Sequence, residues 1–286
     1  MRVGIFIVGA PKSGTTSLHY YLNQHPEILM SSLKEPDYFS HQEILSQGLY
    51  YQKYLVDTIQ KYHNLFNGEK EAKIFGDSSV SYLFYPEVPK RIKEYNSQSK
   101  IIIMLRNPID RAFSHYLMDF RLGFVSSRFE DVFKKKEGLQ FQQYFLLGNY
   151  YLQVKRYIDE FRKENVHIIW YSDFQKDSVK EIQKVFKFID VDSDYKVNVK
   201  TIYNKSFMPR NNIVKIIYSL VFLRKFLLFF FHPILVRFIK SILFIRDNQP
   251  RIARKTRKML IEYYQDDIAS LENLLSINLS EWKKLD

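Results

Sequence analysis

Residues 5–18 read Ile-Phe-Ile-Val-Gly-Ala-Pro-Lys-Ser-Gly-Thr-Thr-Ser-Leu, an apolar run that leads into a loop rich in glycine and hydroxyl residues. Gly9 and Gly14 are spaced like the two glycines of an ATP-binding P-loop. That motif has lysine directly after its second glycine, whereas this chain has Thr15 there and places its lysine earlier, at Lys12. The backbone N–H groups of such a loop, together with the following helix, form a cradle for an anion. The shifted lysine favours a terminal group of single negative charge over a magnesium-bound triphosphate. The alternative is an ordinary strand-to-helix turn without a ligand.

The composition is that of a globular protein. The chain has 286 residues, of which 26% are charged and 46% hydrophobic, and we expect a single domain over residues 1–286. Cysteine is absent, which rules out disulfides and thiolate metal sites and fits a reducing, cytoplasmic location. The apolar start follows only one basic residue, Arg2, and is too short for a signal peptide, so we interpret it as the first strand.

Positive charge is concentrated near the C-terminus. The formal net charge is +12, and residues 213–258 hold eleven Lys/Arg against the single Asp247, a local balance of +10. This balance favours anionic partners, although nucleic acid is a weak candidate because long aliphatic residues separate the basic ones. The longest uncharged run, 226–236, has eleven residues, whereas a membrane span needs about 20. The segment is therefore expected to be a basic amphipathic helical element, either packed on the domain or touching a membrane surface.

Extended and helical patterns alternate along the chain. Short apolar runs such as 101–105 are typical of strands buried on both faces. The alternation predicts a P-loop-like three-layer α/β/α fold with a central parallel sheet and ligands at the carboxyl ends of the strands. The expected strands are 3–8, 28–31, 73–76, 100–105 and 166–171, and the expected helices are 15–23, 86–95, 108–121, 150–163 and 178–189.

A second anion-binding pattern follows the strand at 100–105. Arg106 ends that strand, Pro108 occupies the preferred first position of a helix, and Ser114 lies about two turns into it. An ATPase would usually offer an aspartate for magnesium at such a strand end, whereas a guanidinium binds phosphate directly. Two anion sites on neighbouring strands indicate a nucleotide phosphorylated at two places. The alternative is an arginine paired with a surface carboxylate. The sequence has no obvious Asp/Glu cluster for a metal, and we expect none.

With these motifs the chain resembles the sulfotransferase superfamily that uses 3′-phosphoadenosine 5′-phosphosulfate (PAPS). It is most similar to the heparan-sulfate-type and bacterial carbohydrate sulfotransferases. The resemblance covers residues 3–210 and resumes weakly at 263–282. Its motifs are Pro-Lys-Ser-Gly-Thr-Thr-Ser-Leu at 11–18, Lys-Glu-Pro-Asp-Tyr-Phe at 34–39, Asp-Ser-Ser-Val-Ser-Tyr at 77–82, Arg-x-Pro-x-x-Arg-x-x-Ser at 106–114 and Tyr-Ser-Asp-Phe at 171–174.

The resemblance implies a role for each motif. Lys12 would neutralise the oxygen that bridges phosphate and sulfuryl group, and Arg106 with Ser114 would hold the 3′-phosphate. A basic loop that closes over the nucleotide would contain Lys205 and Arg210, although the sequence there departs from the better-known patterns. The remaining residues expected to bind the nucleotide are Pro11, Ser13, Gly14, Thr15, Thr16, Ser17 and Tyr171. The acceptor would be a hydroxyl or amine of a carbohydrate or glycolipid.

Glu35 is the predicted general base for the acceptor. Pro36 biases it towards an extended backbone, and Lys34 would keep it ionised or contact an anionic acceptor. The alternatives are a solvated loop carboxylate at Glu35 and a different base, His41, whose imidazole titrates near neutrality. His19 and His115 fall inside predicted helices and are interpreted as packing or surface residues.

Other functions remain open at this point. A P-loop kinase or NTPase is disfavoured by Thr15 and Arg106, and a non-catalytic nucleotide-fold binding protein is the third possibility. The acceptor pocket is expected on variable loops at 38–66 and 121–144, whose aromatic residues either stack on sugar rings or fill the core. The disulfide common in Golgi relatives cannot form here, which favours a cytoplasmic, bacterial enzyme, peripheral on the inner face of the membrane if 213–258 binds lipid.

Overall fold

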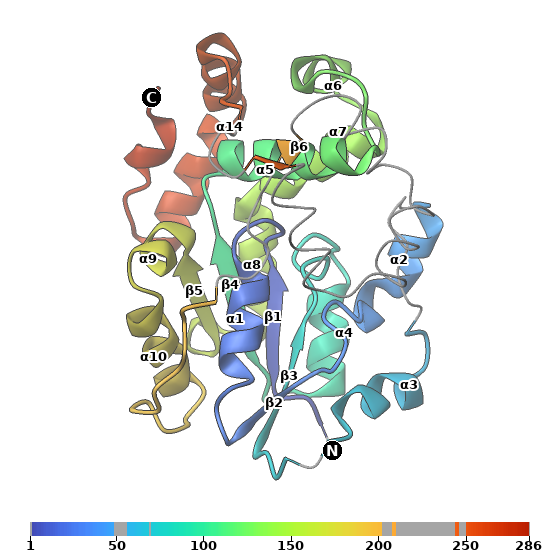
Figure 1. The fold of residues 1–286 in the computed structure, drawn as a ribbon, viewed down its shortest axis with the longest axis vertical. Helices are drawn as coiled ribbons and strands as arrows, with labels where there is room; N and C mark the ends of the chain where they lie inside the picture. The colour runs from blue at the N-terminus through green and yellow to red at the C-terminus, as the bar shows by residue number, and fades with distance from the viewer. Residues whose placement is uncertain are drawn as a thin grey trace.

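A five-stranded parallel sheet in the order β2-β3-β1-β4-β5 forms the centre of the fold (Figure 1). The computed structural model describes residues 2–48, 56–68, 70–201, 208–209, 244–245 and 250–285. Its sheet consists of β1 (Ile5–Gly9), β2 (Ile28–Met30), β3 (Ile74–Ser78), β4 (Lys100–Leu105) and β5 (Val166–Trp170). The expected parallel sheet is confirmed, because every neighbouring pair in it is parallel.

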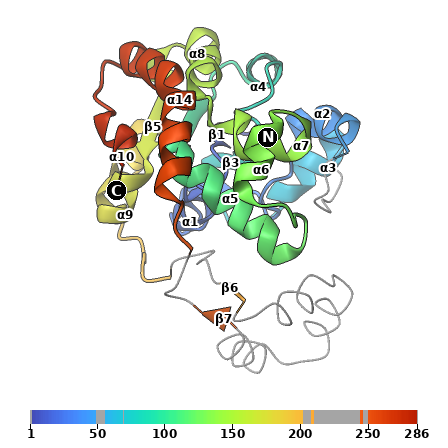
Figure 2. The same ribbon diagram turned by 90° about the horizontal axis from the view of Figure 1, so that it is seen from above.

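Helices cover both faces of the sheet, which confirms the three-layer α/β/α architecture. One face is covered by α1 (Thr15–Leu22), α9 (Tyr171–Lys176) and α10 (Ser178–Phe188). The other face is covered by α4 (Val88–Tyr95), α8 (Tyr150–Phe161) and α14 (Arg254–Leu275). Beyond the carboxyl ends of the strands lie α5 (Pro108–Leu122), α6 (Phe129–Lys135) and α7 (Gly138–Tyr144) (Figure 1). Figure 2 shows α14 passing close to α5 and α8.

Shorter elements connect or flank these helices and strands. They are the 3-10 turns Tyr38–Ser40, Asn64–Phe66, Leu146–Gly148, Lys163–Asn165 and Ser280–Lys283, the helices α2 (His41–Ser46) and α3 (Ile59–His63), and the strands β6 (Met208–Pro209) and β7 (Phe244–Ile245). The two-residue strands β6 and β7 pair with each other in antiparallel orientation.

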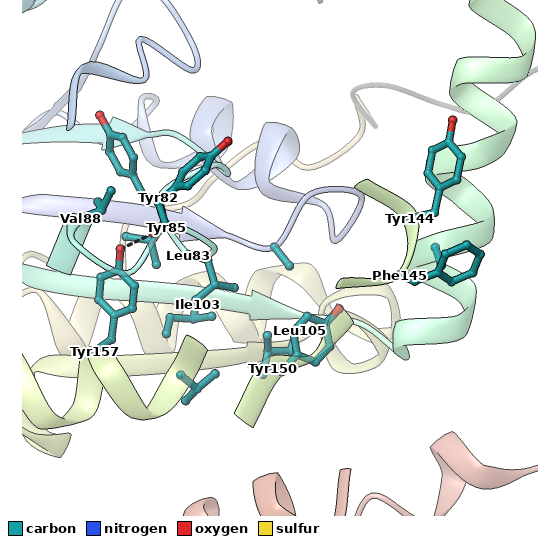
Figure 3. Packing of buried hydrophobic residues seen from close by; sticks show 14 of the residues in the cluster. Tyr82, Leu83, Tyr85, Val88, Ile103, Leu105, Tyr144, Phe145, Tyr150 and Tyr157 are labelled. Atoms are coloured by element: carbon teal, nitrogen blue, oxygen red, sulfur yellow. Dashed lines mark hydrogen bonds between the residues drawn. The ribbon is translucent and has the colours of Figure 1, made fainter. Parts of the chain in front are cut away.

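Strand β4 shows why the sheet is buried on both faces. Its residues alternate in direction, so that Ile103 and Leu105 pack with the cluster of α4, α5 and α8, while Ile102 and Met104 pack with the cluster of α1 and α10. All four side chains are fully buried. Figure 3 shows the first of these clusters, in which tyrosines from α8 lie against the apolar residues of β4. Burial on both faces explains the uninterrupted apolar run of this strand.

The predicted elements agree with the structure to within two residues at every boundary. The expectation that residues 38–66 and 121–144 form loops is wrong. The first segment contains helices α2 and α3, and the second contains α6 and α7. Aromatic residues explain the helices of the second segment: Phe129, Phe133 and Phe141 are buried in the core. Most of the basic segment 213–258 lies outside the described residues, apart from β7 and the stretch that leads into α14.

Candidate active site

The loop between β1 and α1 has the geometry of an anion cradle. Gly14 caps α1 with φ +91°, in the left-handed region, and a Cβ there would lie 3.3 Å from the ring of Tyr171. The first N–H groups of α1, from Thr15 onward, have no partner within the helix. The Ser13 side chain is fully buried, and its Oγ has no hydrogen-bond partner in the described part of the chain. A buried hydroxyl without a partner at the N-terminus of a helix fits an anionic ligand.

Lys12 lies at the centre of a group of charged side chains. Its Nζ is 3.4 Å from the Sδ of Met118 on α5. Burial, and next to it the charges of Arg121 and Arg106, lower the pKa of Lys12 to about 8, while Glu35 and Asp119 act in the opposite direction. Two cations and two carboxylates therefore act on this ammonium group. Because neighbouring cations repel one another, a bound anion would stabilise this group of side chains.

Arg106 connects the end of β4 to residues 10–14, the P-loop-like segment between β1 and α1 that is named the phosphate loop here. Its guanidinium donates a hydrogen bond of 3.1 Å to the backbone carbonyl of Lys12 and lies over the ring of Tyr171, 4.7 Å from the centroid. The backbone carbonyl of Arg106 accepts a hydrogen bond of 3.0 Å from the hydroxyl of Tyr150. Arg106 thus contacts both Lys12 and Tyr171. Lys12 and Arg106 are expected from the loop and strand-end patterns, whereas Tyr171 is expected from the family resemblance.

Helix α5 presents one face to this group. Asn107 caps the helix by accepting a hydrogen bond from the N–H of Ile109, and Pro108 begins it. Ser114, Met118 and Arg121 are spaced by four and three residues, so they share a face of the helix. Because Met118 contacts the Lys12 ammonium, this face points to the phosphate loop. Ser114 is half-buried there. Sequence reasoning missed Met118 and Arg121, although their helical spacing from Ser114 could have indicated them.

Glu35 lies at the carboxyl end of the neighbouring strand β3. Its backbone N–H donates a hydrogen bond of 3.0 Å to the carbonyl of Ser78, and its carboxylate lies 2.5 Å from the Lys34 ammonium. The Glu35 side chain is 32% exposed, so an acceptor could reach it. The expected extended backbone is wrong, because Glu35 has φ +61°. The hydrogen bond to β3 holds the residue in a tight turn, and this outweighs the local preference imposed by the following proline.

His19 and His115, which the sequence places inside helices, are both buried. His19 is 3% exposed on α1, and burial, with Lys34 acting in the same direction, lowers its pKa to about 4, whereas Glu35 opposes this. It is therefore neutral and lies near the Lys34–Glu35 pair, a position that sequence reasoning missed. His115, on α5, is also buried, with its ring 5.5 Å from that of Tyr144.

His41 belongs to a different region of the surface. Its Nδ1 donates a hydrogen bond of 2.8 Å to the carbonyl of Tyr38, since a carbonyl can only accept. The ring lines a hollow of about 410 Å³ together with Arg91, Glu94 and Tyr95. The Tyr95 hydroxyl accepts a hydrogen bond from the N–H of Val3, which precedes β1, so this hollow extends towards the amino ends of the strands. The described contacts of His41 do not include Lys12 or Glu35.

Three further expectations concern Lys205 and Arg210, a bound metal ion and a membrane-spanning helix. Lys205 and Arg210 lie outside the described residues. In the part of the chain that the structure describes, no group of three or more His, Cys, Asp or Glu side chains is arranged to hold a metal ion. None of the described helices combines the length and apolar character needed to cross a membrane.

Comparison with known proteins identifies the family. The family model described as "Sulfotransferase domain" matches residues 3–216, well over half of the chain. The chain belongs to this family. A solved structure of a sulfotransferase from Alicyclobacillus acidocaldarius is 28% identical, with a TM-score of 0.75, and the match covers 99% of this chain and 100% of that one. The match to the family disfavours the kinase interpretation.

Curated relatives align over shorter stretches. The membrane-associated sulfotransferase kil1 of Dictyostelium discoideum is 31% identical over 110 residues, which is 38% of this chain and 21% of that protein. Carbohydrate sulfotransferase 15 of Rattus norvegicus is 24% identical over 249 residues, which is 65% of this chain and 43% of that protein. The matches thus span less than half the length of these two relatives.

Proposed function

We propose that this protein transfers the sulfuryl group of PAPS to a hydroxyl or amine of a carbohydrate acceptor. The observation that carries this proposal is the meeting of Lys12, Arg106 and Tyr171 at the carboxyl ends of the strands, with Glu35 on the adjacent strand end. Ligands of open parallel sheets bind at this edge. Membership in the sulfotransferase family supports the same reaction class.

The two phosphate groups of the donor would occupy the two cationic regions. The buried Ser13 hydroxyl and the first N–H groups of α1 would bind the 5′-phosphosulfate. Arg106 and Ser114 would bind the 3′-phosphate. Further contacts in this proposal come from Pro11, Gly14, Thr15, Thr16, Ser17 and Tyr171, and from Lys205 and Arg210.

Transfer would proceed by in-line displacement at sulfur. The acceptor oxygen or nitrogen forms a bond to sulfur, the bond from sulfur to the bridging phosphate oxygen breaks, and the acceptor proton passes to the carboxylate of Glu35. Negative charge then develops on the departing 5′-phosphate, where the Lys12 ammonium neutralises it. These groups supply positioning and electrostatic stabilisation, as in phosphoryl transfer. No step in this scheme requires a metal.

The acceptor class is proposed from the motif at residues 34–39 and from a relative that is named a carbohydrate sulfotransferase. Lys34 would contact an acidic group of the acceptor or keep Glu35 ionised. A glycolipid acceptor is the narrower version of the proposal, and its support is the basic, apolar composition of residues 213–258. The proposal also places the enzyme in the cytoplasm of a bacterium, with 213–258 as a peripheral membrane contact and residues 1–286 acting as one domain.

Calorimetric titration with 3′-phosphoadenosine 5′-phosphate (PAP), with ADP and ATP as comparisons, tests the donor site. We expect tight PAP binding that requires the 3′-phosphate and that Arg106→Ala weakens by roughly tenfold or more, because a charge-assisted hydrogen bond is lost. Arg91→Ala is the matched control, since Arg91 is ion-paired with Glu43 away from the phosphate loop.

Two other results would redirect the interpretation. Equal or stronger binding of ATP with magnesium would contradict the sulfotransferase proposal and revive the kinase interpretation. PAP binding without transfer of sulfate to any carbohydrate would instead support a non-catalytic binding protein.

A further inference from the structure

The segment that carries Glu35 has an unusual backbone. Glu35 has φ +61° and Asp37 has φ +54°, on either side of Pro36. Residues other than glycine rarely adopt such angles, and they persist only when the surroundings hold them. The position of the Glu35 carboxylate therefore depends on whatever fixes these two residues.

Both residues are tied to the end of β3. The N–H of Glu35 donates a hydrogen bond of 3.0 Å to the carbonyl of Ser78, and the N–H of Asp37 donates one of 3.1 Å to the Oγ of Ser79. The first tether is backbone to backbone and does not depend on a side chain. The second depends on one hydroxyl group, that of Ser79.

The Ser79 hydroxyl is oriented by a buried carboxylate. Its Oγ accepts from Asp37, so its single proton is free to donate, and it donates to Oδ1 of Asp77 at 2.8 Å. The second oxygen, Oδ2, accepts hydrogen bonds of 2.9 Å and 2.8 Å from the hydroxyls of Tyr62 and Tyr82. Three hydroxyl donors on one carboxyl group match the acceptor capacity of a carboxylate.

The hydrogen-bonded cluster of Asp77, Ser79, Tyr62 and Tyr82 lies in the core. The side chains of Asp77 and Ser79 are fully buried. The backbone carbonyl of Tyr82 accepts a hydrogen bond of 2.8 Å from the hydroxyl of Tyr157, which Figure 3 marks with a dashed line. The Asp37 carboxylate accepts a further hydrogen bond from Ser81. Shared donors and acceptors of this kind reinforce one another in a low-dielectric interior.

We propose that Asp77 is a positioning residue, which acts through Ser79 and Asp37 to hold the turn that aims Glu35 at the acceptor. This inference rests on the proposed role of Glu35 as general base. Asp77 itself touches neither the acceptor nor the nucleotide in this proposal. Loss of the Ser79 hydroxyl removes one tether of Asp37, while the hydrogen bonds from Ser81 to Asp37 and from Glu35 to Ser78 remain. The base is then still present but is held less accurately.

Ser79→Ala is the primary test. It removes the hydroxyl that links Asp77 to Asp37 and leaves the carboxylate of Asp77 with its two tyrosine donors. We expect kcat for sulfate transfer to fall by roughly ten- to a hundredfold, the cost expected when a reacting group is displaced by about 1 Å. PAP affinity and the acceptor KM should change less than about twofold, since no binding group is removed. Tyr62→Phe keeps the shape of the cluster and removes one donor to Asp77, so it should lower kcat in the same direction.

Ser99→Ala is the matched control. Ser99 is 1% exposed, and its hydroxyl donates a hydrogen bond of 2.8 Å to the carbonyl of Asn96 near the amino end of β4. This variant loses a comparable buried hydrogen bond at the opposite edge of the sheet. We expect its kcat to equal that of the wild type.

A double-mutant cycle separates positioning from general damage to the fold. If Ser79 acts through Glu35, adding Ser79→Ala to Glu35→Gln causes no further loss of kcat. Additive losses, an unchanged kcat in Ser79→Ala, or a parallel loss of PAP affinity would each overturn the proposal. A wild type that binds PAP but transfers no sulfate would refute the proposed function itself, and this result is distinguishable because it needs no variant.

Discussion

Lys12 illustrates how neighbours determine the chemistry of a single side chain. Lys12 is half-buried near Arg106 and Arg121, and its pKa of about 8 lies below the usual value for lysine. The group is therefore largely charged at neutral pH and loses its proton within the mildly alkaline range. An anion bound at this position stabilises the charged form and raises the pKa again.

The first residue-scale prediction concerns nucleotide affinity and pH. Because PAP binds the charged form of Lys12 more tightly, affinity should be greatest below pH 8 and should fall as the pH rises above 8, by at most about tenfold per unit. Titration calorimetry between pH 7 and 9.5 measures this. Lys12→Ala should bind more weakly at pH 7 and lose the slope. A variant that retains the full slope would show that another group is responsible.

Turnover gives a second prediction at the same scale. Lys12→Ala should lower kcat by roughly 10²- to 10³-fold, because the charge that develops on the departing phosphate is no longer neutralised. Lys100→Ala is the control, since Lys100 donates to Asn165 at the amino end of β4. An equal loss in both variants would contradict the proposed role of Lys12.

At the scale of elements, α14 supports the helices that carry the site. Asp267 on α14 accepts hydrogen bonds of 2.7 Å and 3.1 Å from the N–H groups of Tyr150 and Tyr151, the first residues of α8. Arg257 on the same helix lies 2.6 Å from Asp110 in the first turn of α5. The C-terminal helix thus fixes the start of α5, the helix that carries Ser114 and Met118, and the start of α8. Tyr150 of α8 in turn contacts Arg106.

The pKa of Asp267 leads to a prediction about stability. Burial raises it to about 6, although the two backbone N–H groups oppose the shift. Between about pH 4 and pH 6 the folded state therefore binds more protons at this group than the unfolded state does. Its contribution to the free energy of unfolding then falls as the pH rises, with a slope of at most about 1.4 kcal/mol per unit.

Urea unfolding of the wild type and Asp267→Asn at pH 5 and pH 7 tests this. The amide keeps an oxygen acceptor but does not ionise, so the wild type should lose stability relative to the variant as the pH rises. If the free energies of unfolding of the two proteins differ by the same amount at both pH values, the raised pKa of Asp267 is contradicted.

At the scale of the whole molecule, the parallel sheet gathers distant segments at one edge. The strand order places β1 between β3 and β4, so the loops that contain Lys12, Glu35 and Arg106 meet although they are far apart in the chain. The C-terminal segment adds strong positive charge to this molecule, with a balance of +10 over residues 213–258. In the proposed function, this charge would be attracted to the negative surface of a membrane.

Vesicle sedimentation is the prediction at this scale. The full chain should sediment with vesicles that contain anionic phosphatidylglycerol and should dissociate as the salt concentration rises, since the attraction is electrostatic. Neutral phosphatidylcholine vesicles are the control. Absence of sedimentation with anionic vesicles at low salt would contradict the membrane contact and the glycolipid version of the acceptor, and would leave the transfer of sulfate to soluble carbohydrates unaffected.

Much of the fold could be predicted because local patterns and packing agree. The apolar run of β4 indicates a strand from local sequence alone. In the same way, the proline at the start of α5 indicates the beginning of a helix. The segments 38–66 and 121–144 could not be interpreted in this way. Their helices form because aromatic residues such as Phe133 and Phe141 find a core to enter, and a sequence does not say where that core lies.

The sequence by itself determined the identity of the chemical groups: a phosphate loop with Lys12, a guanidinium at the next strand end and a carboxylate at Glu35. These depend on residue type and short spacing, which the chain carries locally. Only the tertiary structure decided how the groups act on each other. The pKa of Lys12, the contact of Arg106 with Tyr171 and the support of the Glu35 turn by Asp77 all arise between distant segments. Burial and electrostatic coupling depend on distances in space, and these exist only once the sheet has formed.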